Sequence, residues 1–363
     1  MSVLRGAHAA LSSGSTQRPC SAKVGDDREG VRPRPLIYRT RVDGQVSRFR
    51  IFFVSDLHGS EVCFRKFLNS APVYKPDLLI YGGDIMGKIL QPVFRQEAGG
   101  YRWFPTADRY EDFPEAALPE VDRRIADQGR YALLTTPAEW ERRRKDPDAL
   151  EAYCREIGKE RVRQWLKLVA ERLLPKKIPL VMNVGNDDTD GILEILRHEA
   201  PPNVLVPEGQ VVSCGPYEIY GCGYANMTPW HCPRDLEEPD LAKFLDRTSG
   251  QIGQPRRTIL DIHAPPAGTG LDLAPELDEQ LKPKTVSGQL LMTHVGSTSV
   301  RGLIDAVRPV VSLHGHIHES MGVDHVGGTP VYNPGSVYFS GTLQGLILNL
   351  DGDRVADHLF VTG

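Results

Sequence analysis

The sequence lacks several patterns that would place it in a specialised class of protein. No run of about 18 apolar residues occurs, so we expect no membrane-spanning helix. The 6 cysteines are scattered and include no Cys-x-x-Cys pair, which argues against a disulfide framework or a zinc knuckle. A reducing compartment, the cytoplasm, is therefore favoured. Gly221-Cys222-Gly223 has no third glycine and no following helix, so no dinucleotide site is predicted.

The chain also lacks a large net charge of either sign. The formal net charge of −4 gives no electrostatic reason to expect a nucleic-acid partner, although a local basic groove stays open because net charge does not fix its distribution. The first 34 residues are rich in Ser, Gly, Arg and Pro, and Arg5 and His8 interrupt their only apolar piece. Asp26 and Asp27 argue against a transit peptide. We expect residues 1–34 to form a flexible arm.

The composition is that of a globular protein, and its most informative stretch covers residues 50–59. Ile51–Ser55 is a run of apolar or small residues, typical of a short buried strand. The run leads directly into Asp56 and His58, two side chains that bind metals, and Gly59 then allows a turn. In open α/β sheets, ligands bind beyond the carboxyl ends of the strands. Alone, this Asp-x-His is better explained by an aspartate that caps a turn beside a chance histidine.

The same pattern, a buried strand followed by a metal-type side chain, recurs four more times along the chain. The first two expected strands are joined by a helical segment, which predicts a βαβ unit and a parallel sheet. Carboxylates, an amide and imidazoles are the ligand types of divalent cations, so the sequence predicts a metal site at one sheet edge. The residues that follow the five expected strands are Asp56, His58, Asp84, Asn186, His263, His316 and His318.

In chain order, these motifs resemble those of the calcineurin-like metallophosphoesterase superfamily. They are Asp56-x-His58, Gly83-Asp84, Gly185-Asn186-x-Asp188, His263 and Gly315-His316-x-His318. The resemblance covers about residues 50–336. It implies an α/β fold in which a two-sheet β-sandwich is flanked by helices, in four layers ordered α/β/β/α. It further implies that Asp56, His58 and His318 hold one metal. A second metal would be held by Asn186, His263 and His316, and Asp84 would bridge the two.

The resemblance also implies a chemistry. Two adjacent divalent cations can share a water, lower its pKa, and present a bridging hydroxide for in-line attack on a phosphate ester. We therefore expect a phosphate-ester substrate and two divalent metal ions, with manganese favoured and iron, zinc or nickel as alternatives. No membrane partner is expected, and the sequence gives no indication of the oligomeric state.

One position departs from the superfamily pattern. The motif Gly-Asn-His-Asp/Glu commonly places a histidine where this chain has Asp187, and that histidine is thought to protonate the leaving group or steady the phosphate. A carboxylate near a phosphate is repulsive unless it is protonated or turned away. We therefore expect a phosphodiester to be favoured over a monoester. His294, at another strand-to-loop junction, could replace the missing histidine, and a structural loop histidine is an equal alternative.

His294 also competes with His263 as a ligand of the second metal. We prefer His263, because a histidine that follows a strand and precedes Pro265 and Pro266 matches the fourth motif of the superfamily better.

Between the second and third expected strands, the regular alternation of strands and helices is interrupted. We expect a single domain over residues 35–363 that carries an insertion over residues 88–177. The first part of the insertion, Phe94–Tyr110, is aromatic and irregular, and the later part has an amphipathic helical pattern. The insertion begins and ends beside the expected metal ligands, so we predict that it forms a mostly helical lid that sets substrate size.

Two other functions remain possible from the sequence. A protein-binding scaffold of the same fold would have weak or no catalysis, and scaffolds of this kind usually lose metal ligands, which this chain retains. A nuclease would need a basic track and aromatic stacking surfaces. The insertion provides arginines and aromatic residues, but its charges are mixed.

Overall fold

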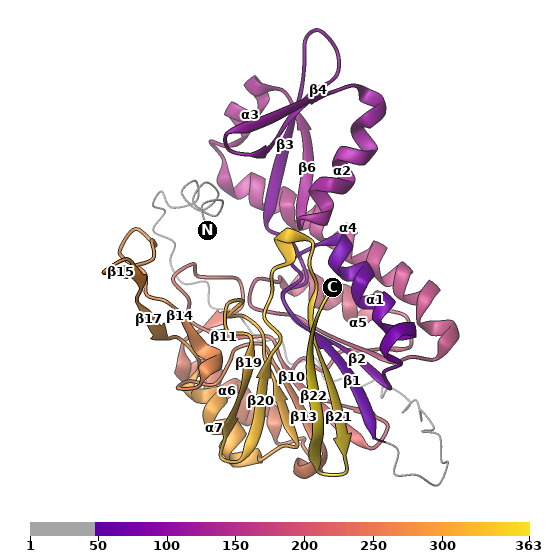
Figure 1. The fold of residues 1–363 in the computed structure, drawn as a ribbon, viewed down its shortest axis with the longest axis vertical. Helices are drawn as coiled ribbons and strands as arrows, with labels where there is room; N and C mark the ends of the chain where they lie inside the picture. The colour runs from indigo at the N-terminus through magenta and orange to yellow at the C-terminus, as the bar shows by residue number, and fades with distance from the viewer. Residues whose placement is uncertain (1–47) are drawn as a thin grey trace.

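The structure, a computed structural model, describes residues 48–363, so the expected N-terminal arm lies outside the described residues. Two six-stranded mixed sheets pack face to face (Figure 1). The first has the order β22-β21-β1-β2-β7-β8. Its strands are β1 (Phe49–Val54), β2 (Leu78–Gly82), β7 (Leu180–Asn183), β8 (Val204–Leu205), β21 (Gln344–Asp351) and β22 (Arg354–Thr362).

The second sheet has the order β19-β20-β18-β13-β10-β9. Its strands are β9 (Val211–Cys214), β10 (Tyr217–Cys222), β13 (Thr258–Ile262), β18 (Val311–Leu313), β19 (Gly322–Val326) and β20 (Thr329–Asn333). In each sheet the central strands run parallel: β1, β2 and β7 in the first, and β10, β13 and β18 in the second. Their carboxyl ends therefore lie at the same edge of each sheet.

Strand β1 shows why its sequence is apolar at every position. Successive side chains of a strand point to opposite faces of the sheet. Ile51 and Phe53 pack into the core between the two sheets, and Phe52 and Val54 pack into the core beneath the helices. Because both faces are covered, the strand is a continuous hydrophobic run, as is typical of buried parallel strands.

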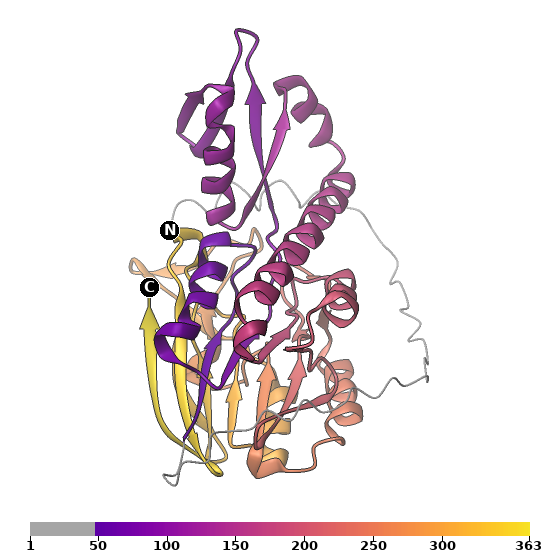
Figure 2. The ribbon, with the colours of Figure 1, turned by 90° about the vertical axis from the view of Figure 1, so that its right-hand side faces the viewer.

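Helices cover the outer face of each sheet and complete the four layers (Figure 2). The first sheet is covered by α1 (Glu61–Tyr74), α4 (Pro147–Arg172) and α5 (Asp190–Glu199), and the second by α6 (Glu238–Ser249) and α7 (Thr298–Val307). This arrangement confirms the α/β/β/α fold class. No helix in the part of the chain that the structure describes is long and apolar enough to cross a membrane.

The insertion contains a separate small sheet that the sequence analysis did not predict. It has the order β5-β4-β3-β6 and projects from one end of the molecule (Figure 1). Residues 94–110, expected to be irregular, mostly belong to these strands, because aromatic residues favour strands and Trp103 is buried in a local core. The elements are β3 (Ile89–Arg95), β4 (Tyr101–Thr106), β5 (Arg109–Phe113), β6 (Arg130–Thr135), α2 (Leu118–Asp127) and α3 (Pro137–Arg143).

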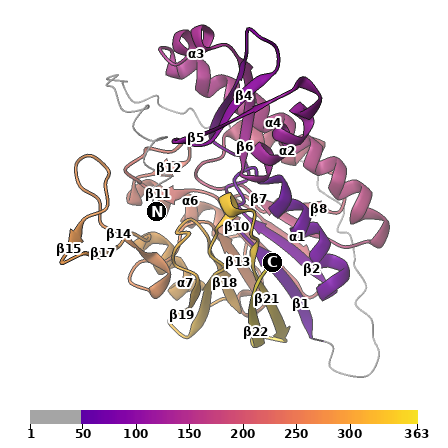
Figure 3. The same cartoon turned by 45° about the horizontal axis from the view of Figure 1, so that its top comes forward.

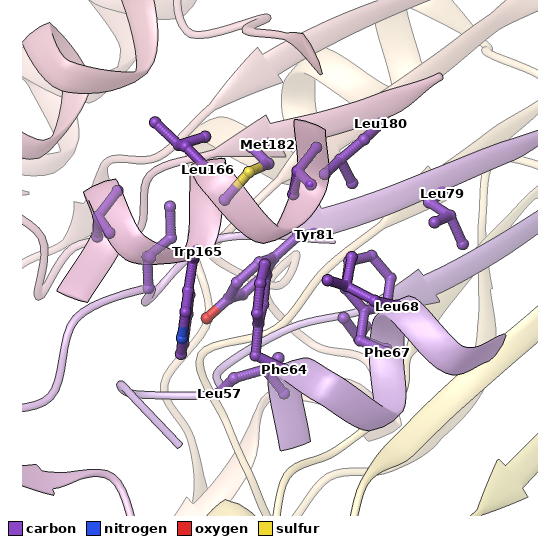
Figure 4. Packing of buried hydrophobic residues seen from close by; sticks show 14 of the residues in the cluster. Leu57, Phe64, Phe67, Leu68, Leu79, Tyr81, Trp165, Leu166, Leu180 and Met182 are labelled. Atoms are coloured by element: carbon purple, nitrogen blue, oxygen red, sulfur yellow. The ribbon is translucent and has the colours of Figure 1, made fainter. Parts of the chain in front are cut away.

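The end of the insertion belongs to the main core. On α4, Trp165 stacks on Phe64 of α1 with ring centroids 4.0 Å apart and an interplanar angle of 4° (Figure 4). The indole Nε1 of Trp165 also donates a hydrogen bond to Glu61 Oε2 at 2.7 Å. Helix α4 therefore stabilises the layer of helices that covers β1 and β2.

We predict that Trp165→Ala lowers the free energy of unfolding by about 3–5 kcal/mol, because it removes a large buried side chain and leaves a cavity. Chemical denaturation followed by circular dichroism measures the change. Val73→Ala, at an exposed position of α1, is the control and should change the free energy by less than about 0.5 kcal/mol. Equal stability of the two variants would show that α4 does not depend on this contact.

Candidate metal centre

The seven residues predicted from the strand ends come together at one edge of the sandwich. Strands β1 and β2 run toward the insertion, and their carboxyl ends lie beside it (Figure 3). The strand ends deliver Asp56 and His58 after β1, Asp84 after β2, Asn186 after β7, His263 after β13, and His316 and His318 after β18. Segments that are hundreds of residues apart in the sequence therefore contribute to a single cluster.

One half of the cluster contains Asp56, His58 and His318, whose ligand atoms lie within 4.8 Å of one another. His318 Nε2 is 3.4 Å from Asp56 Oδ1 and 3.2 Å from His58 Nε2. His58 Nε2 is also 3.5 Å from Asp84 Oδ2. Two imidazole nitrogens and two carboxylates thus surround one small space.

The other half contains His263, Asn186 and His316. His263 Nε2 lies 3.4 Å from Asp84 Oδ2 and 3.7 Å from Asp56 Oδ1. His316 Nδ1 is 3.0 Å from Asn186 Oδ1. Asp84 faces both halves, because the same oxygen, Oδ2, approaches His58 and His263. This is the position that a bridging carboxylate requires.

Four of the seven residues have a left-handed backbone. The φ angles are 58° at Asp56, 42° at His58, 53° at Asp84 and 68° at His316. Residues other than glycine rarely adopt positive φ, and such strain persists only where the surrounding structure enforces it. The strain is concentrated in the sharp turns that direct these side chains into the cluster.

Backbone contacts hold two of these turns together. The His316 N–H donates to both carboxylate oxygens of Asp56 at 3.1 Å. A Cβ at Gly315 would lie 2.3 Å from Asp56 Oδ2, so only glycine allows this close approach. Asn333 donates to the carbonyl oxygens of Gly315 and Ile317 at 3.2 and 2.8 Å. The loop that carries His316 and His318 is therefore fixed from both sides.

Hydrogen bonds also set which atoms of the side chains face the cluster. His263 Nδ1 lies 3.0 Å from the Gly82 carbonyl oxygen, so Nδ1 carries the proton and Nε2 faces the carboxylates. Asn186 Nδ2 donates to Asp235 Oδ1 at 2.9 Å, which directs the amide oxygen toward His316. These outer partners orient the ligand atoms in the way that metal sites require.

Two of the histidines are neutral at neutral pH. Burial lowers the pKa of His58 and of His316 to about 3. Burial also disfavours the charged form of His263, but the carboxylates of Asp84 and Asp56 outweigh it and raise the pKa of His263 to about 10. In a chain without metal, His263 therefore keeps a proton beside the two carboxylates.

The cluster has the composition and spacing of a site for divalent cations. Among residues 48–363, buried His263 Nε2 has no hydrogen-bond partner, although two carboxylate oxygens lie 3.4 and 3.7 Å away. Ligand atoms bound at about 2.0–2.2 Å from one cation lie roughly 3.0–3.4 Å apart, which is close to these separations. The residues present therefore fit the two metals that the sequence implied, and the predicted assignment of ligands to each metal becomes a proposal.

Asp187, the residue that departs from the superfamily pattern, lies beside the cluster. Its Oδ2 forms an ion pair with Lys88 Nζ and lies 3.9 Å from His58 Nδ1. Its backbone N–H donates to Asp84 Oδ1 at 3.0 Å. The Asp187 carboxylate is thus ionised and faces the cluster, and the ammonium group of Lys88 neutralises its charge.

His294 occupies a different place. Its Nδ1 is 2.7 Å from Asp272 Oδ1, its side chain is 55% exposed, and it lies on β17 (Met292–His294). Among the described residues, no hydrogen bond or ion pair joins it to the seven clustered residues. The structure therefore places His263, and not His294, among the metal-type side chains, and a proton-transfer role for His294 stays a prediction.

Sequence reasoning missed Lys88 and Asp235 as parts of this site. The only signal for Lys88 was its position four residues after Asp84, directly after Gly87. Asp235 follows a Pro-rich loop, and nothing in its local sequence links it to Asn186, 49 residues earlier.

One of the comparisons with solved structures agrees with this fold. No protein-family model matches the sequence. An uncharacterized protein from Methanocaldococcus jannaschii is 30% identical over 152 residues, which is 41% of this chain and 61% of that protein, less than two thirds of its length. A solved crystal structure superposes with a TM-score of 0.51 at 18% identity, covering 87% of this chain and 98% of its own. A protein from Thermus thermophilus has a TM-score of 0.48 at 15% identity, covering 87% and 99%.

We predict that Asp84→Asn reduces the metal content of the purified, reloaded protein below two ions per chain, because a neutral amide replaces the carboxylate that faces both halves of the cluster. Plasma mass spectrometry measures the content. The control is Asp353→Asn, an exposed carboxylate in the turn between β21 and β22. Two ions per chain in Asp84→Asn would rule out the bridging assignment.

We further predict that metal binding releases at least about one proton at pH 7.5, because the cation must displace the proton that His263 keeps, and the pKa values of Asp84 and His318 are also raised. Since the pKa of His263 is raised to about 10, metal affinity should rise as the pH increases from 6 to 9. Calorimetric titration with Mn²⁺ in two buffers of different ionisation enthalpy counts the protons. A binding enthalpy that is the same in both buffers would contradict this prediction, and His325→Ala, an exposed histidine on β19, should behave as the wild type.

Proposed function

We propose that this chain, which has the four-layer fold of the calcineurin-like metallophosphoesterases, is a metal-dependent phosphoesterase. The observation that carries the proposal is the convergence of seven oxygen and nitrogen donors from five strand ends on one edge of the sandwich. Structural histidines and aspartates do not require this convergence, nor do they require a buried imidazole nitrogen that faces two carboxylates but forms no hydrogen bond with any described residue.

The chain's own residues have defined tasks in this proposal. Asp56, His58 and His318 would hold one cation, and Asn186, His263 and His316 the other, with Asp84 between them. When bound, two such cations supply an activated water and neutralise charge on the phosphoryl oxygens. The rigid, strained turns at Asp56, Asp84 and His316 keep the ligand atoms in place, which limits reorganisation during the reaction.

The substrate preference is proposed from the residues beside the cluster. No histidine occupies the position of Asp187, so the side chain there cannot serve the leaving group as an imidazole would. This favours phosphodiesters over monoesters, and it favours good leaving groups. Manganese is the proposed metal, because mixed carboxylate, amide and imidazole ligands suit it.

The nuclease alternative has less support. In the insertion, Arg102 pairs with Asp112 at 2.6 Å and Arg124 with Glu111 at 2.7 Å. Arginines already paired with acids offer a weak track for a phosphate backbone. The insertion lies at the edge that carries the cluster, which is where a lid must lie, and its role in substrate size stays a prediction.

We predict that the chain, stripped with a chelator and reloaded with Mn²⁺, hydrolyses an aryl phosphodiester faster than the matching aryl phosphomonoester. The stripped protein should be inactive until metal is restored, and release of the aryl alcohol measures both rates. Faster monoester hydrolysis would contradict the diester preference but not the phosphoesterase proposal. Two bound metals with no hydrolysis of either ester would instead favour a protein-binding scaffold.

A further inference from the structure

Lys88 is a charged residue beside the cluster that has no role in the proposed binding of the two metals. It is the first residue of the insertion, next to the start of β3, and its ammonium group pairs with Asp187. Neither Lys88 nor Asp187 is one of the predicted metal ligands. Among the described residues, Lys88 Nζ makes no other hydrogen bond, so two of its three N–H donors are uncommitted.

The backbone beneath Lys88 is held firmly against the metal edge. The buried Asp188 carboxylate accepts hydrogen bonds from the backbone N–H groups of Ile85 and Met86, and from that of Gly185 at 2.8 Å. Asp188 therefore ties the loop after β2 to the loop after β7. Because the two loops are fixed together, Lys88 and Asp187 meet at a defined place.

Gly87 further restricts the position of the backbone at Lys88. Its N–H donates to the Tyr131 hydroxyl at 2.9 Å, and a Cβ at this position would lie 2.3 Å from the Gly129 carbonyl oxygen. Only glycine fits between these groups, so the chain passes close to β6 immediately before Lys88. The position of the lysine is thus set by the fold and not by a free loop.

The exposure of the side chains shows from which side a substrate reaches the cluster. Asp56, Asp84 and His263 are almost completely buried, whereas the side chain of His318 is 29% exposed and that of Lys88 is 47% exposed. Solvent therefore meets the cluster where Lys88 and His318 lie. An anionic substrate that approaches from there comes close to the ammonium group of Lys88.

The charge of Asp187 affects how a phosphate group can bind at the cluster. Asp187 is only 8% exposed and lies within 3.9 Å of His58, so its negative charge would repel a phosphate group at the cluster. Lys88 cancels that charge. A lysine that also keeps uncommitted donors can attract a phosphoryl oxygen, because an ammonium group binds phosphate as a compact point charge.

We propose that Lys88 is a substrate-binding and catalytic residue, whose ammonium group donates a hydrogen bond to a non-bridging phosphoryl oxygen while Asp187 holds it in position. The proposal rests on the phosphoesterase function proposed above. It assigns Asp187 a positioning role through Lys88, which explains how an acidic residue is tolerated at this place. No proton transfer is required of either residue.

A merely structural alternative makes a different prediction. If Lys88 only neutralised Asp187, removal of both charges would restore activity. We therefore compare Lys88→Met, Asp187→Asn and the double variant Lys88→Met/Asp187→Asn, with Lys243→Met on the exposed surface of α6 as the control. Lys88→Arg tests whether a cation of another shape rescues the function, and Lys88→Gln is a second neutral variant in case Lys88→Met folds poorly.

Two measurements decide between the alternatives. Aryl phosphodiester hydrolysis gives kcat and KM of the Mn²⁺-loaded proteins, and calorimetry gives their affinity for inorganic phosphate. We expect Lys88→Met to lower kcat/KM by roughly 100-fold. Its phosphate affinity should fall by roughly tenfold while two metals per chain remain bound. The double variant should stay at least roughly tenfold below the wild type in kcat/KM, and Lys88→Arg should recover part of the loss.

Several results would overturn the proposal. Full activity in the double variant would reduce Lys88 to a counter-ion of Asp187. Wild-type kcat/KM and phosphate affinity in Lys88→Met would remove Lys88 from the site, while the phosphoesterase function would stand. If the wild type hydrolysed no phosphate ester, that function would fail, and Lys88-dependent phosphate binding would still support the anion-binding part of the inference.

Discussion

The mutual repulsion of buried acidic groups is the constraint on which this site depends. Asp56, Asp84 and Asp187 lie within one small region, and burying unpaired carboxylates is costly. Within residues 48–363, Lys88 pairs with Asp187 in this region, and His263 keeps a proton. The remaining negative charge and the imidazole nitrogens that have no hydrogen-bond partner among these residues fit the divalent cations proposed for the cluster.

The sandwich makes this concentration of charge possible. Parallel strands of both sheets end at one edge, and the tight turns beyond them accept positive φ angles at Asp56, His58, Asp84 and His316. The conformational strain of these turns is offset by apolar burial on both faces of β1 and β2 and by the hydrogen bonds of Asn333 and Asp188. The packing around β1 and β2 thus stabilises the fold and also keeps the predicted metal ligands rigid.

The sequence predicted the parts of the molecule that depend on local pattern. Buried strands that end in metal-type residues are readable from the chain, so the seven clustered residues could be expected. The four-layer fold was expected from the resemblance of these motifs to those of the superfamily. The partners of those residues could not be read, because Lys88 and Asp235 reach the site only through the tertiary fold. The sheet in the insertion was missed because the spacing of its aromatic residues is irregular. The contact of His294 with Asp272, 22 residues away, likewise depends on the tertiary fold.

The proposed function depends on two cations that bind in one shared site. Electron paramagnetic resonance of the protein loaded with two equivalents of Mn²⁺ tests it directly, because two ions that share a carboxylate are magnetically coupled. The cluster around Asp84 predicts the broad multiline spectrum of a coupled pair. A six-line spectrum of isolated Mn²⁺ at the same loading would contradict the two-metal centre and the function proposed from it.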